Sequence, residues 1–434
     1  MKTWSRLSWN WKNLKSSGRR IDHSFSQMQV RWLEAGSDLN PSTRPPHSGA
    51  PANTGIKSCM GRPALACCAV GDTLNSPDSI DRTIICPASE HYPRYNNGSV
   101  VTLDDGSLLL VYQCWYTSGS GDASPSRVEG KLSSDGGRTW GTEFIIKESY
   151  EPELYLGGGR RIGSPSLLKL ESGQMLLFHD VMNSERDHRN FLSRSSDDGL
   201  TWSQSVPIIG RVGYYVINND RVILLSSGRI LAPVADHGGP FDQRGVSFGL
   251  YSDDEGRTWT RGSGQVVVNG DAGAQEPGVV ELRDGRVLMF IRTSLGRPHK
   301  CYSEDGGDTW SSPEPMSVWS PTSPQAIRRI PSTGDLLMAW NNTSGGLRSP
   351  LTLAVSSNEG RTWGHMLDIE TEQGHTYSYP SILFQNDEAL LTYYDHDSTA
   401  QAKDAVSKSP QGTGWAGLVS LKLAIVPLAR IYSA

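Results

Sequence analysis

From about residue 79 onward, short runs of apolar residues alternate with polar turns along most of the chain. Each repeat contains an apolar strand, a polar-glycine turn and a second apolar strand, so the pattern predicts antiparallel hairpins rather than helices. The sixth hairpin occupies Ser381 to Tyr394 and turns at Asp387-Glu388. The other five each turn at a glycine: Gly106, Gly173, Gly228, Gly285 and Gly334.

A short tryptophan box of the form Ser-x-Asp-x-Gly-x-Thr-Trp follows each of the first five hairpins. Its copies end at Trp140, Trp202, Trp259, Trp310 and Trp363, and the last copy has Asn358 in place of the aspartate. Repeats spaced 51 to 62 residues apart indicate a propeller or a solenoid. The aspartate can accept hydrogen bonds from its own turn, while the tryptophan anchors the hairpin. We therefore interpret the boxes as structural latches without a catalytic role.

Six hairpins and a closing apolar strand at Leu418 to Ile431 predict an all-β fold, a six-bladed β-propeller with Asp-box repeats over residues 76–434. Residues 1–75 show no sustained period, and residues 40–53 are rich in Pro, Ser and Gly. This segment is predicted to be a poorly ordered N-terminal extension.

Composition narrows the class of protein. The net charge of −5 argues against nucleic acid as a general partner. No apolar run approaches 18 residues, so no transmembrane segment is predicted. The six cysteines show no Cys-x-x-Cys spacing, and no zinc or redox motif follows from them. No standard signal peptide follows Met1, so the protein is expected to be either cytoplasmic or secreted by an unrecognised route. The oligomeric state also stays open.

Polar residues recur at the start of the first strand of each hairpin. Stepping back nine residues from each turn glycine, with the equivalent step in the sixth hairpin, gives Asn97, Ser164, Asn219, Glu276, Gln325 and Tyr379. Equivalent strand ends of a propeller converge around its central channel. These six positions, which we call the mouth positions, therefore predict a polar binding mouth.

Two further patterns involve the mouth positions. Glu276 and Arg292 are symmetric about the turn at Asp284, so they are expected to face each other across neighbouring strands, about 5 Å apart. The cluster Asn218-Asn219-Asp220-Arg221 precedes the third hairpin, and Asp236-His237 closes it. It is compatible either with recognition of sugar hydroxyl groups or with capping and turn chemistry.

The five boxes, the Glu276 and Arg292 pair, the later Arg348, and Tyr379 about 30 residues after it together resemble the sialidases (exo-α-neuraminidases), over residues 80–432. The resemblance is to the broad bacterial sialidase-like branch of the Asp-box (BNR) repeat family. It implies that Arg94, Arg292 and Arg348 clamp the substrate carboxylate. It also implies that Tyr379 is the nucleophile with Glu276 as its base, and that Asp122 is the acid/base.

One motif departs from the sialidase pattern. Sialidases usually carry the first arginine in an aromatic-Arg-x-Pro setting, whereas this chain has Tyr92-Pro93-Arg94. For the nucleophile, Tyr377 is a rival of Tyr379, because side chains two residues apart share one face of a strand.

The implied activity is that of a retaining exo-glycosidase that removes terminal α-linked sialic acid, or a related 2-keto acid sugar, from an acidic glycan or glycoconjugate. A guanidinium presents a fixed fork of charged donors that suits a planar carboxylate. A tyrosine of ordinary pKa needs a base, and tyrosine nucleophiles are the sialidase exception among glycosidases. No metal or organic cofactor is required.

Two alternatives stay open. The same pocket could serve a polysaccharide lyase, or a hydrolase of another acidic sugar, with Tyr379 as the base. Alternatively, the chain could be a carbohydrate-binding propeller without catalytic activity.

Overall fold

The chain divides into two units, Met1–Gly71 and Asp72–Ala434, and the second is the one described below. In the computed structural model, the described residues are 79–116, 122, 124–149, 161–184, 186–238, 244–398 and 418–434. The predicted N-terminal extension, residues 1–75, lies outside them.

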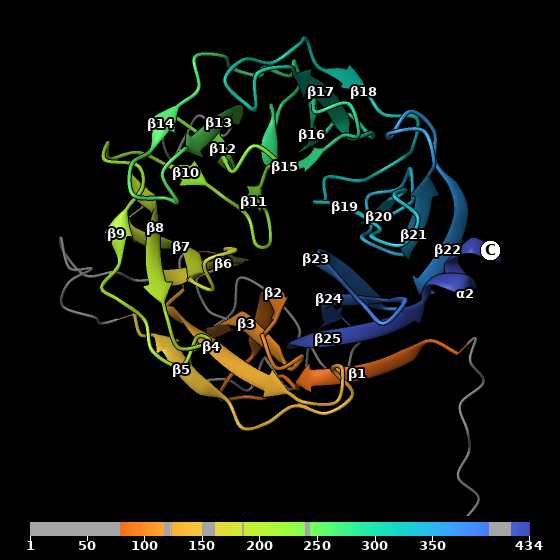
Figure 1. Ribbon diagram of the computed structural model, residues 1–434. Helices are drawn as coiled ribbons and strands as arrows, with labels where there is room; N and C mark the ends of the chain where they lie inside the picture. Colours follow the sequence, from red (N-terminus) through yellow and green to blue (C-terminus); the bar gives the residue numbers. More distant parts are fainter. Residues whose placement is uncertain are drawn as a thin grey trace, which may run out of the picture. The chain divides into compact units, whose positions relative to one another are not determined.

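The described fold is built almost entirely of antiparallel strands, as the alternating pattern predicts (Figure 1). The first and second groups are β2 (Arg94–Thr102), β3 (Leu108–Trp115), β4 (Ser126–Ser133) and β5 (Phe144–Lys147), then β6 (Arg161–Lys169), β7 (Met175–Ser184), β8 (Asp187–Ser195) and β9 (Val206–Pro207). The third group is β10 (Tyr215–Val216), β11 (Ile223–Leu224), β12 (Ile230–Asp236), β13 (Val246–Ser252) and β14 (Thr260–Arg261).

Three more groups follow in chain order. The fourth and fifth are β15 (Gln275–Glu281), β16 (Val287–Arg292), β17 (His299–Ser303) and β18 (Glu314–Pro315), then β19 (Ala326–Arg329), β20 (Leu336–Trp340), β21 (Leu351–Ser356) and β22 (Gly364–Glu370). The sixth is β23 (His375–Gln385), β24 (Glu388–Asp397), β25 (Leu418–Pro427) and β1 (Asp81–Cys86). Parallel contacts of β2 with β25 and of β4 with β6 join the first, second and sixth groups into one 12-stranded sheet.

The closing strand mostly follows the prediction. β25 pairs with β24 on one side and with β1, from the beginning of the described chain, on the other. In Figure 1 the orange β1 accordingly lies beside the blue β25. The predicted end at Ile431 is wrong, because the strand stops at Pro427 and the short helix α2 (Leu428–Tyr432) follows. No helix among the described residues is long and apolar enough to span a membrane.

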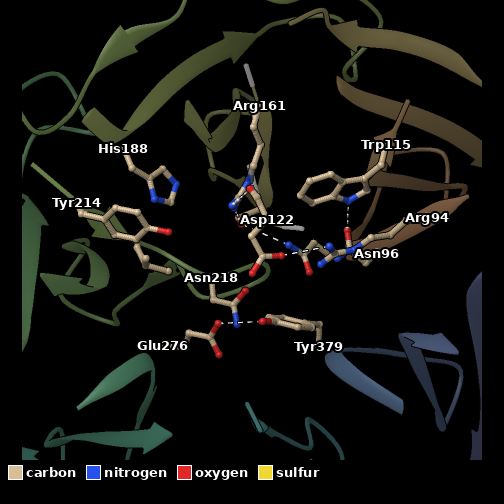
Figure 2. Close-up of a pocket in the computed structure, with 13 residues that line it drawn as sticks. Arg94, Asn96, Trp115, Asp122, Arg161, His188, Tyr214, Asn218, Glu276 and Tyr379 are labelled. Carbon is tan, nitrogen blue, oxygen red and sulfur yellow. Dashed lines mark hydrogen bonds and ion pairs between the residues drawn. The ribbon is translucent and has the colours of Figure 1, made fainter. Parts of the chain in front are cut away.

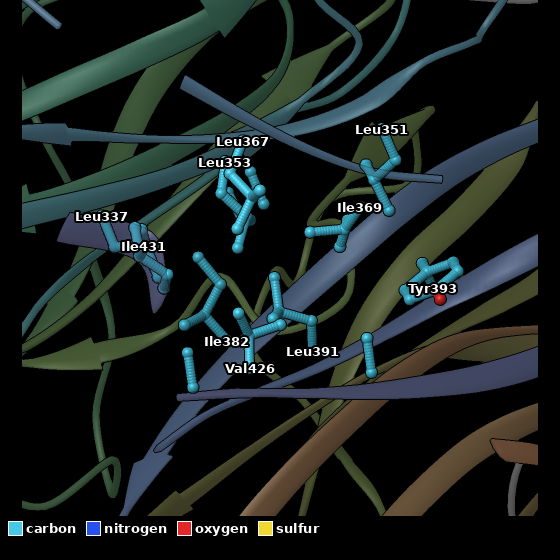
Figure 3. Packing of buried hydrophobic residues seen from close by; sticks show 14 of the residues in the cluster. Leu337, Leu351, Leu353, Leu367, Ile369, Ile382, Leu391, Tyr393, Val426 and Ile431 are labelled. Atoms are coloured by element: carbon cyan, nitrogen blue, oxygen red, sulfur yellow. The ribbon is translucent and has the colours of Figure 1, made fainter. Parts of the chain in front are cut away.

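The hydrophobic core consists of clusters that each join two successive groups of strands. Alternate residues of β3 contribute to different clusters: Leu109 and Val111 contact the second group, whereas Leu108 and Leu110 contact the sixth. Figure 3 shows the cluster between the fifth and sixth groups, where Leu353 and Val426 are among the labelled residues. Because both faces of the central strands are buried, these strands read as nearly continuous apolar runs.

The tryptophan boxes form the predicted latches. In the first box, the Asp135 carboxylate accepts hydrogen bonds from the amide (2.8 Å) and hydroxyl (2.5 Å) of Thr139, and the indole of Trp140 donates to the carbonyl of Gly137 at 2.9 Å. Asn358 preserves the pattern in the fifth box by accepting from the amide of Thr362 at 2.9 Å and donating to its hydroxyl at 2.7 Å. The asparagine therefore substitutes for aspartate without loss of the turn.

Four of the six mouth positions lie in β-bulges. Asn97, Ser164, Glu276 and Tyr379 have positive φ angles of 56°, 47°, 40° and 55°, and the strand register shifts by one residue at each of them. A bulge leaves one residue without a cross-strand partner and redirects its side chain. As a result these side chains leave the alternating pattern of the strand.

The bulge corrects one prediction. Arg292 lies directly opposite Gln275 rather than Glu276, because the register shifts between Gln275 and Gly278. The prediction assumed that every residue of the hairpin is paired across the two strands, whereas Glu276 lies in the bulge and has no cross-strand partner. The two side chains nevertheless meet.

Candidate active site

A polar pocket lies where the mouth positions of several groups come together (Figure 2). Two of the mouth positions, Glu276 and Tyr379, belong to strand groups far apart in the sequence and line the same pocket. Its lining residues are Arg94, Asn96, Asn97, Trp115, Asp122, Arg161, Ser164, His188, Tyr214, Val216, Asn218, Glu276 and Tyr379.

Tyr379, Glu276 and Arg292 form a continuous chain of hydrogen bonds. The Tyr379 hydroxyl donates to Glu276 Oε1 at 3.0 Å, and Arg292 Nη1 donates to Glu276 Oε2 at 2.5 Å. Burial acts to raise the pKa of Glu276, but the charge of Arg292 outweighs it and holds this pKa below its usual range. Burial and the neighbouring Glu276 carboxylate raise the pKa of Tyr379 well above its ordinary value. A neutral phenol therefore donates to an ionised carboxylate.

Arg348 lies next to the same tyrosine. Its guanidinium carbon is 5.9 Å from the centroid of the Tyr379 ring. It is held there by hydrogen bonds to the hydroxyl of Tyr394 at 2.9 Å and to the carbonyl of Thr322 at 3.0 Å. Arg292 and Arg348 thus both flank the Tyr379 and Glu276 pair.

Arg94 lies with Asp122 in the same pocket. Arg94 Nη1 donates to Asp122 Oδ1 at 3.1 Å, and the guanidinium carbon is 4.2 Å from the centroid of the Trp115 ring. The Asp122 side chain is 63% exposed, whereas that of Arg94 is 8% exposed. Desolvation acts to raise the pKa of Asp122, but the charges of Arg94 and Arg161 hold it below the usual aspartate range. In the ligand-free protein this carboxyl group is therefore ionised rather than protonated.

Tyr377, the rival tyrosine, is completely buried on β23 and packs against Tyr393 and His375. Tyr379 instead lines the pocket, because the bulge between Ser378 and Ser381 turns it out of the strand. The geometry favours Tyr379.

Asn219, Asp220 and Arg221, from the cluster before the third hairpin, are buried, and none of the three lines the pocket. Asn219 is fully buried and donates to the carbonyl of Gly98 at 2.8 Å. Asp220 Oδ2 accepts from Arg328 at 3.2 Å, and the buried Arg221 donates to the carbonyl of Gln325 at 2.7 Å. These bonds connect separate strand groups, so the geometry favours a structural role for all three. Asn218, the first residue of the predicted cluster, lines the pocket instead.

Arg161 was not among the residues predicted from the sequence. It lies three residues before the mouth position Ser164, as Arg94 lies three residues before Asn97. Cross-strand pairing aligns Arg94 with Trp115, Trp115 with Ser126, and Ser126 with Arg161. Counting back three residues from the mouth position of the second group, as from Asn97 to Arg94 in the first, would have identified Arg161. Arg161 contacts Asp180, which is also close to His188.

The described residues contain no group of three or more side chains arranged to hold a metal ion. The pocket lining instead includes two arginines, Arg94 and Arg161, two carboxylates and two phenols. Arg292 and Arg348 are not lining residues and adjoin the pocket through Glu276 and Tyr379. Such an arrangement can bind an anion through charge-assisted hydrogen bonds and can transfer protons at both ends.

The chain resembles known proteins in sequence. Residues 116–392 match the family model described as a BNR repeat-like domain. A sialidase of Micromonospora viridifaciens is 27% identical over 63% of this chain and 46% of its own length. A sialidase of Bacteroides fragilis is 23% identical over 68% of this chain and 59% of its own length. The chain thus spans about half the length of these curated relatives.

Solved structures show the same fold. The NanB sialidase from Streptococcus pneumoniae superposes with a TM-score of 0.62 at 16% identity, covering 82% of this chain and 71% of that one. The matched family model spans more than half of the chain and includes the second, third, fourth and fifth strand groups in full. The chain therefore belongs to the BNR repeat-like family, together with sialidase relatives.

Proposed function

We propose that the protein is a retaining exo-glycosidase that hydrolyses terminal α-linked sialic acid, or a related 2-keto acid sugar, from glycans. The observation that carries this proposal is the hydrogen-bonded chain from Tyr379 through Glu276 to Arg292. A neutral tyrosine beside an ionised carboxylate has the arrangement of a nucleophile and its base. The sialidase relatives support the choice of substrate.

Substrate binding in this proposal uses the three arginines. Arg94, Arg292 and Arg348 bind the substrate carboxylate, with the guanidinium fork supplying paired donors. Since Arg94 holds Asp122 in the free protein, the incoming carboxylate displaces Asp122 from it.

Two displacement steps then follow. The Tyr379 oxygen attacks the anomeric carbon as Glu276 takes its proton, the bond to the leaving oxygen breaks, and Asp122 in its protonated form gives that oxygen a proton. Water then attacks the anomeric carbon of the tyrosyl-linked sugar while Asp122 takes the proton from that water. Glu276 returns its proton to the departing Tyr379 oxygen, which regenerates the enzyme. Two displacements at one carbon retain its configuration.

The scaffold in this proposal is a six-bladed propeller. Each antiparallel group serves as one blade, and six hydrophobic clusters lie between successive groups, including one between the sixth group and the first. The pairing of β1 with β25 would then close the ring. A crystal structure with another number of blades would reject this scaffold.

The nucleophile assignment is tested by trapping. Incubation with a 2,3-difluoro sialic acid reagent should give a peptide adduct on Tyr379, and Tyr379→Phe should lose both the adduct and the release of 4-methylumbelliferone from its α-sialoside. Tyr302→Phe, on β17 beside the fourth box, is the matched control and should behave like the wild type. An adduct on Tyr377 or Glu276 would reject the assignment.

The same assays separate the alternatives. A lyase would release a product with a new carbon–carbon double bond. A binding propeller would retain affinity for an acidic sugar without turnover on any acidic glycoside of a test panel.

A further inference from the structure

We propose that Arg161 is a positioning residue, which holds the backbone of Asp122 so that its carboxyl group can reach the leaving oxygen. This inference rests on the proposed function, since it concerns the acid of that reaction. Arg161 Nη1 donates to the main-chain carbonyl of Asp122 at 3.1 Å. Because this hydrogen bond is made to the backbone, it depends neither on the protonation of the Asp122 carboxyl group nor on its contact with Arg94.

Arg161 is itself held rigidly from the other side. Its Nη2 donates to Asp180 Oδ2 at 2.8 Å, and Asp180 is completely buried. His188 Nε2 lies 3.2 Å from the same carboxylate oxygen. Arg161 is 8% exposed and lies beside Trp115, with its guanidinium carbon 5.6 Å from the ring centroid. Because the guanidinium is planar, fixing one nitrogen on Asp180 also fixes the direction of the nitrogen that reaches Asp122.

The charge of Arg161 is already balanced by Asp180. That ion pair distinguishes Arg161 from Arg94, whose carboxylate partner Asp122 is exposed and can leave. Breaking a buried pair is strongly unfavourable, because it leaves a charge without compensation. Arg161 therefore stays in place when a substrate anion enters and does not join the three arginines that bind it.

Asp122 needs a support that survives substrate binding. Among the described residues, the hydrogen-bond donor to its carboxylate is Arg94, the group from which the substrate displaces it. After displacement the side chain loses this contact, whereas the bond from Arg161 to the backbone persists. The position of the acid then depends on Arg161.

The expected signature is a dependence on the leaving group. A sugar hydroxyl oxygen, such as that of the lactose in sialyllactose, leaves poorly unless it is protonated. 4-Methylumbelliferone is an acidic phenol, so it leaves with little assistance from an acid. General acid catalysis contributes about 10²–10⁴-fold in rate. Loss of a positioned acid should therefore affect sialyllactose far more than the aryl sialoside.

The test compares Arg161→Lys with the wild type on both substrates. Lysine keeps the charge beside Asp180 but cannot donate to Asp180 and Asp122 in the same fixed geometry. We expect kcat/KM for sialyllactose to fall about tenfold or more beyond any fall for the aryl sialoside. Arg189→Lys is the matched control, because Arg189 is a buried arginine of β8 paired with Asp187 at 2.6 Å outside the pocket lining.

The outcomes are distinct. Equal losses on both substrates, or no loss, would overturn the positioning role of Arg161. If Arg161→Lys does not fold by circular dichroism, Asp180→Asn, which loosens the anchor of Arg161, should show the same leaving-group effect. Failure of both variants to fold would make the pair a purely structural element and would also reject the proposal. A wild-type protein inactive on both substrates would instead reject the proposed function itself.

Discussion

Replacement of Asp122 with asparagine should strongly reduce turnover of glycans while leaving the affinity for a sialic acid analogue unchanged or increased. In the free protein the Asp122 carboxylate occupies Arg94, at 3.1 Å, and Arg94 is the guanidinium proposed to bind the ligand carboxylate. Asp122 is thus an internal competitor of the ligand. Asparagine has nearly the same shape but no charge, so it competes less.

The size of the effect follows from the exposure of the pair. The Asp122 side chain is 63% exposed, so solvent screens the interaction. Coulomb attraction across 3.1 Å at the dielectric constant of water is about 1.3 kcal/mol. Measured exposed ion pairs contribute about 0.2–1 kcal/mol. Removal of the competitor should therefore strengthen binding by at most about fivefold, whereas turnover should fall by about 10²–10⁴-fold through loss of the acid.

Isothermal titration calorimetry with 2-deoxy-2,3-didehydro-N-acetylneuraminic acid measures the affinity. Asp104→Asn is the matched control, because Asp104 is 77% exposed and pairs with Lys169 at 2.6 Å on the protein surface. Titrations near pH 5 in buffers of different ionisation enthalpy also count protons. Arg94 and Arg161 keep the pKa of Asp122 low in the free protein, so a ligand that takes Arg94 should raise it and cause proton uptake.

The asparagine variant should show no such uptake, and the affinity of the wild type should rise as the pH falls. Binding to Asp122→Asn that is tenfold weaker than to the wild type would refute the reasoning. It would mean that the carboxylate supports the ligand rather than competing with it.

Two further predictions concern the arginine clamp and the stability of the sixth strand group. Arg292→Lys should lower kcat/KM by about 10- to 100-fold, because one hydrogen bond between charged groups is worth about 1.5–3 kcal/mol. Arg286→Lys, in the turn that joins β15 to β16, should change kcat/KM little; equal values for the two variants would remove Arg292 from the site. His375 lies 2.6 Å from Asp395; burial acts to lower the pKa of His375, but Asp395 outweighs it and raises the pKa. The stabilisation by this ion pair is complete below the ordinary histidine pKa and is lost as the pH rises through the raised pKa of His375. His375→Gln should therefore lower the melting temperature more at pH 5.5 than at pH 8.5. The control His91→Gln, at an exposed histidine, should show no such difference between the two pH values. A larger effect at pH 8.5 would contradict the sign.

Much of the strand arrangement was accessible from the sequence, because local rules determine it. The turn glycines adopt the positive φ expected of them; Gly106 and Gly285, for example, have φ of 85° and 83°. Alternation of side chains with period two then determines which face each apolar residue covers. The hairpins followed from these two rules, and the antiparallel pairings confirm them.

Features that depend on contacts between distant residues were harder to predict. The bulge at Glu276 shifted the register, so that Gln275 rather than Glu276 lies opposite Arg292. Asn219 and Arg221 are polar in sequence but lie in the buried centre, where they connect strand groups. Spacing along the chain carries no measure of burial, so their structural role could not be separated from a binding role.

The four bulged mouth positions, Asn97, Ser164, Glu276 and Tyr379, have a consequence for how such a site can diverge. A positive φ at a non-glycine residue costs about 1–3 kcal/mol of strain. That cost belongs to the backbone rather than to any particular side chain, and the hydrophobic clusters between the strand groups carry it. Exchange among unbranched polar side chains such as Asn, Asp and His at these positions therefore adds little new strain, whereas a β-branched side chain would add more. Mutant libraries confined to them would vary the chemistry of the pocket while every core cluster stays intact.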